Sequence, residues 1–130
     1  MSRNMKNFDL WNKLKKQLDS RSEFPFASPR EIWWCSMGLN VGVEINGKNE
    51  NFERPVVIIK AYSTEMLRVV PLTTKLKTGK FYLRLNTDVS ESCAVLSQAR
   101  IISAKRLVRK VSKLSEKDFE NIKKGLKELN

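Results

Sequence analysis

The 130-residue chain contains no histidine at all. Histidine is the side chain whose ordinary pKa lies closest to neutral pH, and it is the commonest metal ligand. The sequence also has no CxxC pair, no close cluster of Asp and Glu, and neither of the glycine-rich motifs GxGxxG and GxxxxGK[ST]. These absences disfavour metal hydrolases, P-loop proteins and Ser-His-Asp enzymes. We expect no cofactor and no metal, and any catalysis must use Arg, Lys, Glu, Thr or Ser.

Cysteine and long apolar runs are scarce as well. The two cysteines, Cys35 and Cys93, fit no metal or redox spacing, so we expect two reduced, half-buried thiols. No apolar run approaches the roughly 20 residues that a membrane helix needs, and no continuous apolar segment follows Arg3 and Lys6 to make a signal peptide. We therefore expect a cytoplasmic protein with no membrane partner.

Positive charge, by contrast, is abundant. The 25 Lys and Arg residues outnumber the 14 Asp and Glu residues, which gives a net charge of +11 and a pI near 9.9. Such an excess in a small chain favours a polyanionic partner, namely a nucleic acid, an acidic protein segment or an anionic membrane surface. The alternative is that the charge serves general solubility.

The N-terminal part differs in pattern from the rest of the chain. Residues 5–19 are predicted to form an amphipathic helix, with apolar residues at helical spacing: Phe8, Trp11, Leu14 and Leu18. Residues 20–29 hold two prolines and three serines, which break a helix. We assign 1–29 to a helix and linker, and 30–130 to the main domain. The helix either packs on that domain, which we favour, or binds another chain.

Several short strands are predicted between residues 30 and 113, from runs rich in β-branched and aromatic residues. Their ranges are 30–37, 55–60, 66–72, 81–85, 92–97, 99–103 and 108–113. A final helix begins at Ser115, which has capping-box spacing to Asp118. Its apolar stripe consists of Phe119, Ile122, Leu126 and Leu129. This order predicts a mainly β, α+β fold: a small β-barrel with a C-terminal helix and an extra N-terminal helix.

The stretch Glu53-Arg54-Pro55 followed by Val56-Val57-Ile58-Ile59 stands out among the strands. Four β-branched residues in a row predict a strand buried on both faces. Pro55 fits the first residue of a strand, where no N–H is needed. Arg54 would then stand at the start of a rigid strand, where its fork of N–H donors could bind phosphate. The alternative is a simple ion pair with Glu53 or Glu50.

Five cations at Lys105, Arg106, Arg109, Lys110 and Lys113 form the densest basic stretch. Two interpretations remain open for it. It is either a solvated strand face or a contact for a polyanion.

The chain resembles the MazF/PemK family of toxins from toxin–antitoxin modules. The blocks that carry this resemblance follow the family order over residues 30–129: Arg30-Glu31-Ile32-Trp33-Trp34, Gly42-Val43-Glu44, Arg54-Pro55-Val56-Val57-Ile58-Ile59, Val70-Pro71-Leu72-Thr73-Thr74, and Ser92-Cys93-Ala94-Val95-Leu96-Ser97-Gln98-Ala99-Arg100 leading to Lys105-Arg106-Leu107. The resemblance implies an SH3-like barrel, a homodimer, and metal-independent cleavage of single-stranded RNA. It also implies neutralisation by an acidic antitoxin protein.

The resemblance further implies roles for individual residues. The family's phosphate-stabilising arginine falls on Arg54, its catalytic threonine on Thr73, and its loop glutamate on Glu44. For RNA contacts, we expect a wider set: Arg30, Trp34, Thr74, Lys75, Lys77 and Gln98. Trp34 has an alternative role in the core or a dimer contact.

Two positions depart from the family pattern. Val43 stands where some members carry a histidine, and Ser97 stands where many carry an acid. A non-catalytic or weakly active nucleic-acid or protein-binding module on the same fold is therefore the alternative to a ribonuclease.

Overall fold

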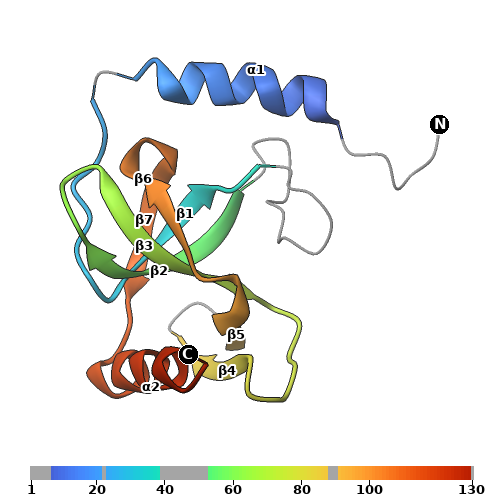
Figure 1. Cartoon of the computed structure of the whole chain (residues 1–130), viewed down its shortest axis with the longest axis vertical. Helices are drawn as coiled ribbons and strands as arrows, with labels where there is room; N and C mark the ends of the chain where they lie inside the picture. Colours follow the sequence, from blue (N-terminus) through green and yellow to red (C-terminus); the bar gives the residue numbers. More distant parts are fainter. Residues whose placement is uncertain (1–6, 22, 39–52, 88–90, 130) are drawn as a thin grey trace.

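A computed structural model describes residues 7–21, 23–38, 53–87 and 91–129. Two α-helices flank the strands, and two single turns of 3-10 helix interrupt them (Figure 1). In chain order the elements are α1 (Phe8–Asp19), β1 (Glu31–Ser36), β2 (Glu53–Ala61), β3 (Met66–Thr73), β4 (Tyr82–Asn86), β5 (Glu91–Val95), η1 (Leu96–Gln98), β6 (Arg100–Ser103), η2 (Ala104–Arg106), β7 (Leu107–Lys113) and α2 (Glu116–Glu128). The prediction of a mainly β, α+β protein with a helix at each end is confirmed.

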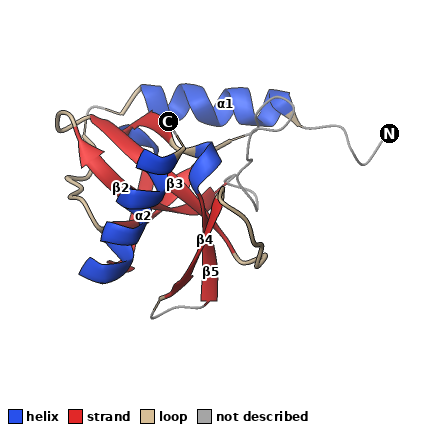
Figure 2. Cartoon of the chain, turned by 60° about the horizontal axis from the view of Figure 1, so that its bottom comes forward, coloured by secondary structure: helices blue, strands red, loops and turns tan. Residues whose placement is uncertain are grey.

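The strands form one antiparallel sheet in the order β4-β5-β3-β2-β1-β7, and β6 pairs with β3. Because β3 is long, its first half pairs with β6 and its last two residues pair with β5. Strands β6 and β7 lie at opposite ends of the run β6-β3-β2-β1-β7, yet η2 alone joins them. A three-residue link can connect these two edges only if the sheet curls, which produces the small barrel. The β4–β5 pair projects from it (Figure 2).

Two hydrophobic clusters pack on the two faces of this sheet. Val57 and Ile59 lie in one cluster, and Val56 and Ile58 lie in the other. Side chains alternate between faces along a strand, so the unbroken apolar run of β2 supplies both clusters. The prediction of a strand buried on both faces is confirmed.

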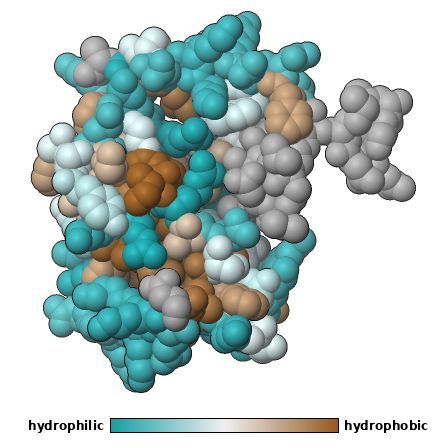
Figure 3. Space-filling view, in the orientation of Figure 1, coloured by the Kyte–Doolittle hydropathy of each residue, from teal (hydrophilic) through white to brown (hydrophobic). Residues whose placement is uncertain are grey.

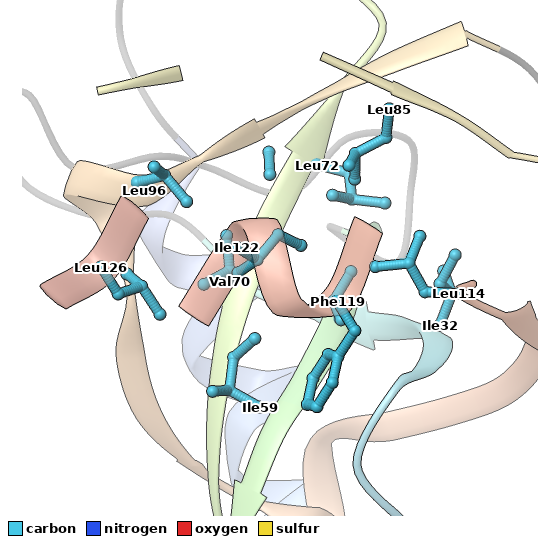
Figure 4. Packing of buried hydrophobic residues seen from close by; sticks show 12 residues of the cluster. Ile32, Ile59, Val70, Leu72, Leu85, Leu96, Leu114, Phe119, Ile122 and Leu126 are labelled. Carbon is cyan, nitrogen blue, oxygen red and sulfur yellow. The ribbon is translucent and has the colours of Figure 1, made fainter. Parts of the chain in front are cut away.

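Helix α2 closes the first of these clusters. Its N-cap residue Ser115 accepts a hydrogen bond from the backbone N–H of Asp118 at 3.1 Å. Phe119, Ile122 and Leu126 are buried against the sheet (Figure 4). Gly125 permits this close packing, because a Cβ there would lie 2.7 Å from a methyl group of Leu96. Leu129 also packs against the cluster, as the sequence predicts.

Helix α1 lies on the side of the barrel away from α2 (Figure 1). Trp11 is its one buried residue, and the guanidinium of Arg106 lies 5.4 Å from the centre of a Trp11 ring. Arg21 Nη1 donates to the carbonyls of Lys105 and Leu107, so the end of the helix is tied to η2. The helix packs on its own chain, as we favoured. Phe8, however, is exposed and contributes nothing to the buried face.

Several predicted boundaries are wrong by one to three residues. Strand β2 begins at Glu53 rather than Pro55, and Pro55 pairs with Trp34 of β1. Arg30 precedes β1 in a turn with a φ of +77°. Strand β5 ends at Val95, since η1 turns the chain from its pairing with β4 toward β6. Ser97, which was predicted to end a strand, therefore lies in a 3-10 turn together with Gln98. In the described part of the chain, no helix is long and apolar enough to cross a membrane.

Candidate functional site

Arg54 and Thr73 come together where β2 begins and β3 ends. The two strands are antiparallel with Val56 opposite Pro71. Extending this register by two residues would bring Arg54 level with Thr73. The Nη1 group of Arg54 donates to the carbonyl oxygen of Leu72 at 3.1 Å. That carbonyl belongs to the peptide bond between Leu72 and Thr73. The structure thus joins two residues that lie 19 positions apart in the sequence.

The guanidinium of Arg54 is held rigidly in this place. Only 8% of the residue is exposed, and burial lowers the pKa of Arg54 from its ordinary value. An arginine guanidinium nevertheless stays protonated in proteins. A buried charge in a medium of low dielectric interacts more strongly with an anion than the same charge in water. Arg54 is therefore a preorganised cation at the start of β2.

Thr73 is the last residue of β3 and is half-buried. Its hydroxyl oxygen accepts a hydrogen bond from the backbone N–H of Lys75 at 3.2 Å. A hydroxyl carries one donor as well as two acceptor sites, so this bond fixes the oxygen and leaves its proton for another acceptor. Arg54 and Thr73 together can offer N–H and O–H donors to one anionic group.

The basic loop after Thr73 is anchored to β5. The N–H of Lys77 donates to the sulfur of Cys93 at 3.3 Å, and the Cys93 thiol donates back to the Lys77 carbonyl at 3.5 Å. Cys93 is also the strand partner of Thr73. The backbone of Lys77 therefore lies beside Thr73, and the side chains of Thr74, Lys75 and Lys77 are exposed around it.

A second cluster lies on the neighbouring strands and contains Glu53 and Arg109, which are not among the predicted catalytic and RNA-contact residues. Arg109 lies over the ring of Trp34, 5.1 Å from its centre. Its Nη1 group is 3.4 Å from the Oε1 atom of Glu53. Glu53 is only 4% exposed. Trp34 and Arg109 are strand partners, so Arg109 covers one face of the half-buried indole.

Glu53 and Arg54 are adjacent in sequence but serve different contacts. Neighbouring residues in a strand point to opposite faces of the sheet, and Glu53 pairs with Arg109 on β7. This alternation of side chains along a strand would have argued against the simple ion pair between Glu53 and Arg54. What the sequence could not show was the Arg109 partner, because β7 lies more than 50 residues further along the chain.

Arg30 and Gln98 lie on other parts of the fold. The Nε group of Arg30 donates to the carbonyl of Leu114 at 3.1 Å, and its Nη1 group lies 3.6 Å from Glu116. The N–H of Arg30 donates to Ile58, which is four residues, or about 13 Å of strand, beyond Arg54. Gln98 lies in η1 and is half-buried. Glu44, together with Gly42 and Val43, lies outside the described residues.

Among the residues that the structure describes, no three His, Cys, Asp or Glu side chains gather in a way that could hold a metal ion. The side chains at the site are those of arginine, lysine and threonine. Their N–H and O–H groups donate hydrogen bonds, which suits an anionic ligand.

Comparison with known proteins identifies the class of protein to which this fold and site belong. The sequence model of the PemK-like, MazF-like toxins of type II toxin–antitoxin systems matches residues 28–129. The chain belongs to this toxin family, as the resemblance predicted. A comparison with curated proteins gives no match.

Solved structures support the same fold. The chain is similar to MazF of Deinococcus radiodurans, with a TM-score of 0.67 and 15% identity over 83% of this chain and 97% of that one. It is similar to an endoribonuclease of a mycobacterial species, with a TM-score of 0.61 and 12% identity over 79% and 89%. A MazE–MazF structure from Deinococcus radiodurans gives a TM-score of 0.59 and 13% identity over 83% and 96%. Identities this low establish the fold alone.

Proposed function

We propose that this toxin-family protein is an endoribonuclease that cleaves single-stranded RNA without a metal ion. The observation that carries the proposal is the placement of Arg54 against the Leu72–Thr73 peptide. The buried guanidinium of Arg54 bonds the Leu72 carbonyl, and the next residue, Thr73, leads into an exposed basic loop. Membership of the toxin family and the fold of a solved endoribonuclease support this reading.

The chemistry that suits these groups begins at the RNA itself. The 2′-hydroxyl gives up its proton and attacks the adjacent phosphorus, a bond forms between them, and the bond to the 5′-oxygen breaks. The products are a 2′,3′-cyclic phosphate and a 5′-hydroxyl, whose oxygen takes its proton from water. Negative charge grows on the non-bridging phosphate oxygens during this step. We assign Arg54 and Thr73 to these oxygens, because preorganised donors in a water-poor site stabilise developing charge most effectively. The contact to Leu72 orients the guanidinium for this role.

A base must take the proton of the 2′-hydroxyl. We keep Glu44 as the candidate, although a carboxylate with a pKa near 4.3 is a weak base unless its surroundings raise that value. Glu53 is a poor substitute, because it is buried and paired with Arg109. We assign Glu53 to positioning Arg109 over Trp34.

The RNA contacts follow from the exposed groups around the pair. We place phosphates on Lys75 and Lys77, a hydroxyl contact on Thr74, and a stacked base on the partly exposed ring of Trp34. Gln98 and Arg30 would contact the bound RNA further from the cleaved bond, although Arg30 already forms an ion pair with Glu116.

We further propose an acidic antitoxin protein as partner, a homodimer as the active form, and the cytoplasm as location. The net charge of +11 and the solved MazE–MazF relative support the antitoxin.

The experiment compares RNA cleavage by the wild type, Arg54→Ala and Arg54→Lys on a long single-stranded RNA. Loss of one preorganised donor typically lowers the rate about 10² to 10³-fold, so Arg54→Ala should lose that much. Arg54→Lys keeps a charge without the planar fork and should recover only part of the rate. Lys117→Ala, in the exposed first turn of α2, is the matched control for loss of one charge. Circular dichroism confirms that each variant folds.

A non-catalytic binding module on the same fold is the second candidate, and the observation that favours it is the Val43 and Ser97 departures. Wild-type protein that binds RNA yet cuts none of it would establish this alternative. Cleavage by Arg54→Ala at the wild-type rate would show that Arg54 does not act at the phosphate.

A further inference from the structure

A basic groove of about 490 Å³ lies between α2 and the hairpin end of β2 and β3. Five cations line it, two from the strands and three from the helix: Lys60, Arg68, Lys123, Lys124 and Lys127. The one carboxylate that lines it is Glu120, so the formal charge of the groove is five positive against one negative. In the space-filling view, hydrophilic side chains gather over α2 at the bottom of the molecule (Figure 3). None of these residues is used by the proposed cleavage site.

Most of this charge is not neutralised within the described part of the chain. Glu120 pairs with Lys123 at 3.2 Å, and Lys60 lies over the ring of Tyr62. Arg68, Lys124 and Lys127 make no ion pair with any described residue. Like charges held this close repel one another and attract a polyanion. The groove is therefore suited to a partner that brings several negative charges at once.

The floor of the groove helps to identify that partner. Ile59 and Leu126 form the floor, and they are only 9% and 7% exposed. An amphipathic acidic peptide binds by inserting apolar anchors into pockets, and this covered floor offers them little surface. A sugar–phosphate backbone needs only cations. The groove thus fits a nucleic acid strand better than an acidic protein segment.

Position and spacing favour the same occupant. Lys123 and Lys127 are four residues apart on one helix face, with about 6 Å between their Cβ atoms. Phosphates of one strand repeat at intervals of a few ångströms, so one strand can meet several of these lysines. Lys60 and Arg54 lie on the same strand β2, about 20 Å apart by the rise of an extended chain. RNA that flanks a bond held at Arg54 would have to extend over at least this distance to reach the groove.

We propose that the groove between α2 and the β2–β3 hairpin binds the backbone of the RNA strand that flanks the cleaved bond. This inference rests on the proposed ribonuclease function for its substrate. It adds a second, sequence-independent contact region away from the chemistry.

The test uses the double variant Lys124→Ala/Lys127→Ala in the full chain. The control, Lys13→Ala/Lys117→Ala, removes the same charge from exposed positions outside the groove. Binding of a 2′-O-methyl RNA, which cannot be cut, is measured between 50 and 200 mM salt. Each phosphate contact to a single strand contributes about 0.7 to the slope of log K against log salt. The salt slope of the groove variant should be smaller than that of the wild type by about 1.4. This corresponds to roughly 25-fold weaker binding at 0.1 M salt, while the control keeps its slope.

Cleavage assays extend the test. On a long RNA, the groove variant should show a raised KM with an unchanged kcat, because the lost contact is remote from the reacting phosphate. On an oligonucleotide that covers only the cleavage site, it should match the wild type. A slope equal to that of the control would overturn the proposal. The proposal would also be overturned if the groove variant lost binding to poly-glutamate but bound RNA as the wild type does, because the groove would then bind an acidic protein.

The two proposals fail in distinguishable ways. If the groove variant binds the uncut RNA more weakly and the wild type cleaves no RNA, the proposal of RNA binding in the groove is supported and the proposal of ribonuclease activity is refuted. If the wild type cleaves RNA and the groove variant keeps the wild-type salt slope, only the proposal of RNA binding in the groove is refuted.

Discussion

The contact between Trp11 and Gly38 offers a sharp test of how α1 is attached to the barrel. Trp11 is 6% exposed, and Gly38 has a φ of +77°. A Cβ built on Gly38 would lie 2.1 Å from two carbons of the Trp11 ring. The ring therefore occupies the space that any side chain at position 38 would need. Substitution of Gly38 by alanine should both strain the backbone and displace the tryptophan.

The two costs can be separated by a double-mutant cycle. A left-handed conformation costs an alanine about 1 to 2 kcal/mol. Truncation of a buried aromatic residue costs about 3 kcal/mol at the low end of the observed range, so Trp11→Ala should cost about that much. Gly38→Ala should cost about 4 kcal/mol in the wild type, because it adds backbone strain to much of the lost tryptophan packing. In the Trp11→Ala background it should cost only the strain, which leaves a coupling of about 2 to 3 kcal/mol.

The assay is guanidinium unfolding followed by far-UV circular dichroism, because fluorescence would itself change when Trp11 is removed. Gly79→Ala is the matched control. Gly79 has a φ of +118°, but a Cβ there would meet no atom within 4 Å. It should cost backbone strain in both backgrounds and show no coupling to Trp11. Additive costs for Gly38→Ala and Trp11→Ala, within about 0.5 kcal/mol, would refute the packing of the ring on Gly38.

Two further predictions concern ionisable groups, the half-buried Glu31 and the buried Cys35. Burial alone would raise the pKa of Glu31, but hydrogen bonds from the Ser28 N–H, Lys110 and Trp33 outweigh it, and the pKa lies below its ordinary value of 4.5. The carboxylate therefore stabilises the fold above pH 4.5, and this stabilisation is lost as the pH falls through the folded-state pKa. Glu31→Gln should lower the free energy of unfolding by about 2 kcal/mol at pH 7 and by progressively less in acid; urea unfolding at several pH values measures this, and a pH-independent difference would contradict it. Burial also raises the pKa of Cys35 to about 12, so iodoacetamide at pH 8 should leave Cys35 unlabelled in the folded protein and label it in urea. Peptide mass spectrometry reads the result, and rapid labelling of the folded chain would show that the thiol is accessible.

Local features of the chain were predictable because neighbouring residues determine them. The run Val56–Ile59 predicted a strand buried on both faces. Ser115 and the apolar stripe after it predicted α2 and its inward face. Periodicity and capping depend only on residues within a few positions of one another in the sequence, so these elements could be predicted. Family membership was also readable, since it depends on the order of short blocks along the sequence.

Boundaries were less predictable where pairing with a distant strand decides them. Strand β2 starts at Glu53 because Ser36 and Cys35 of β1 pair with Glu53 and Arg54, and no local signal reports such a partner. Phe8 has the right helical spacing, yet it is exposed because the barrel contacts α1 through Trp11.

The amino-acid sequence specifies which residue types are available: no histidine, an excess of cations, and an arginine and a threonine within family blocks. Which of these groups contact one another depends on how the strands pack. The tertiary structure placed Arg54 on the Leu72 carbonyl beside Thr73, Glu53 with Arg109 over Trp34, and five cations around one groove. The physical reason is that antiparallel register and sheet curvature arise from packing among strands far apart in the chain. A side chain's partners are therefore known only once that packing is known.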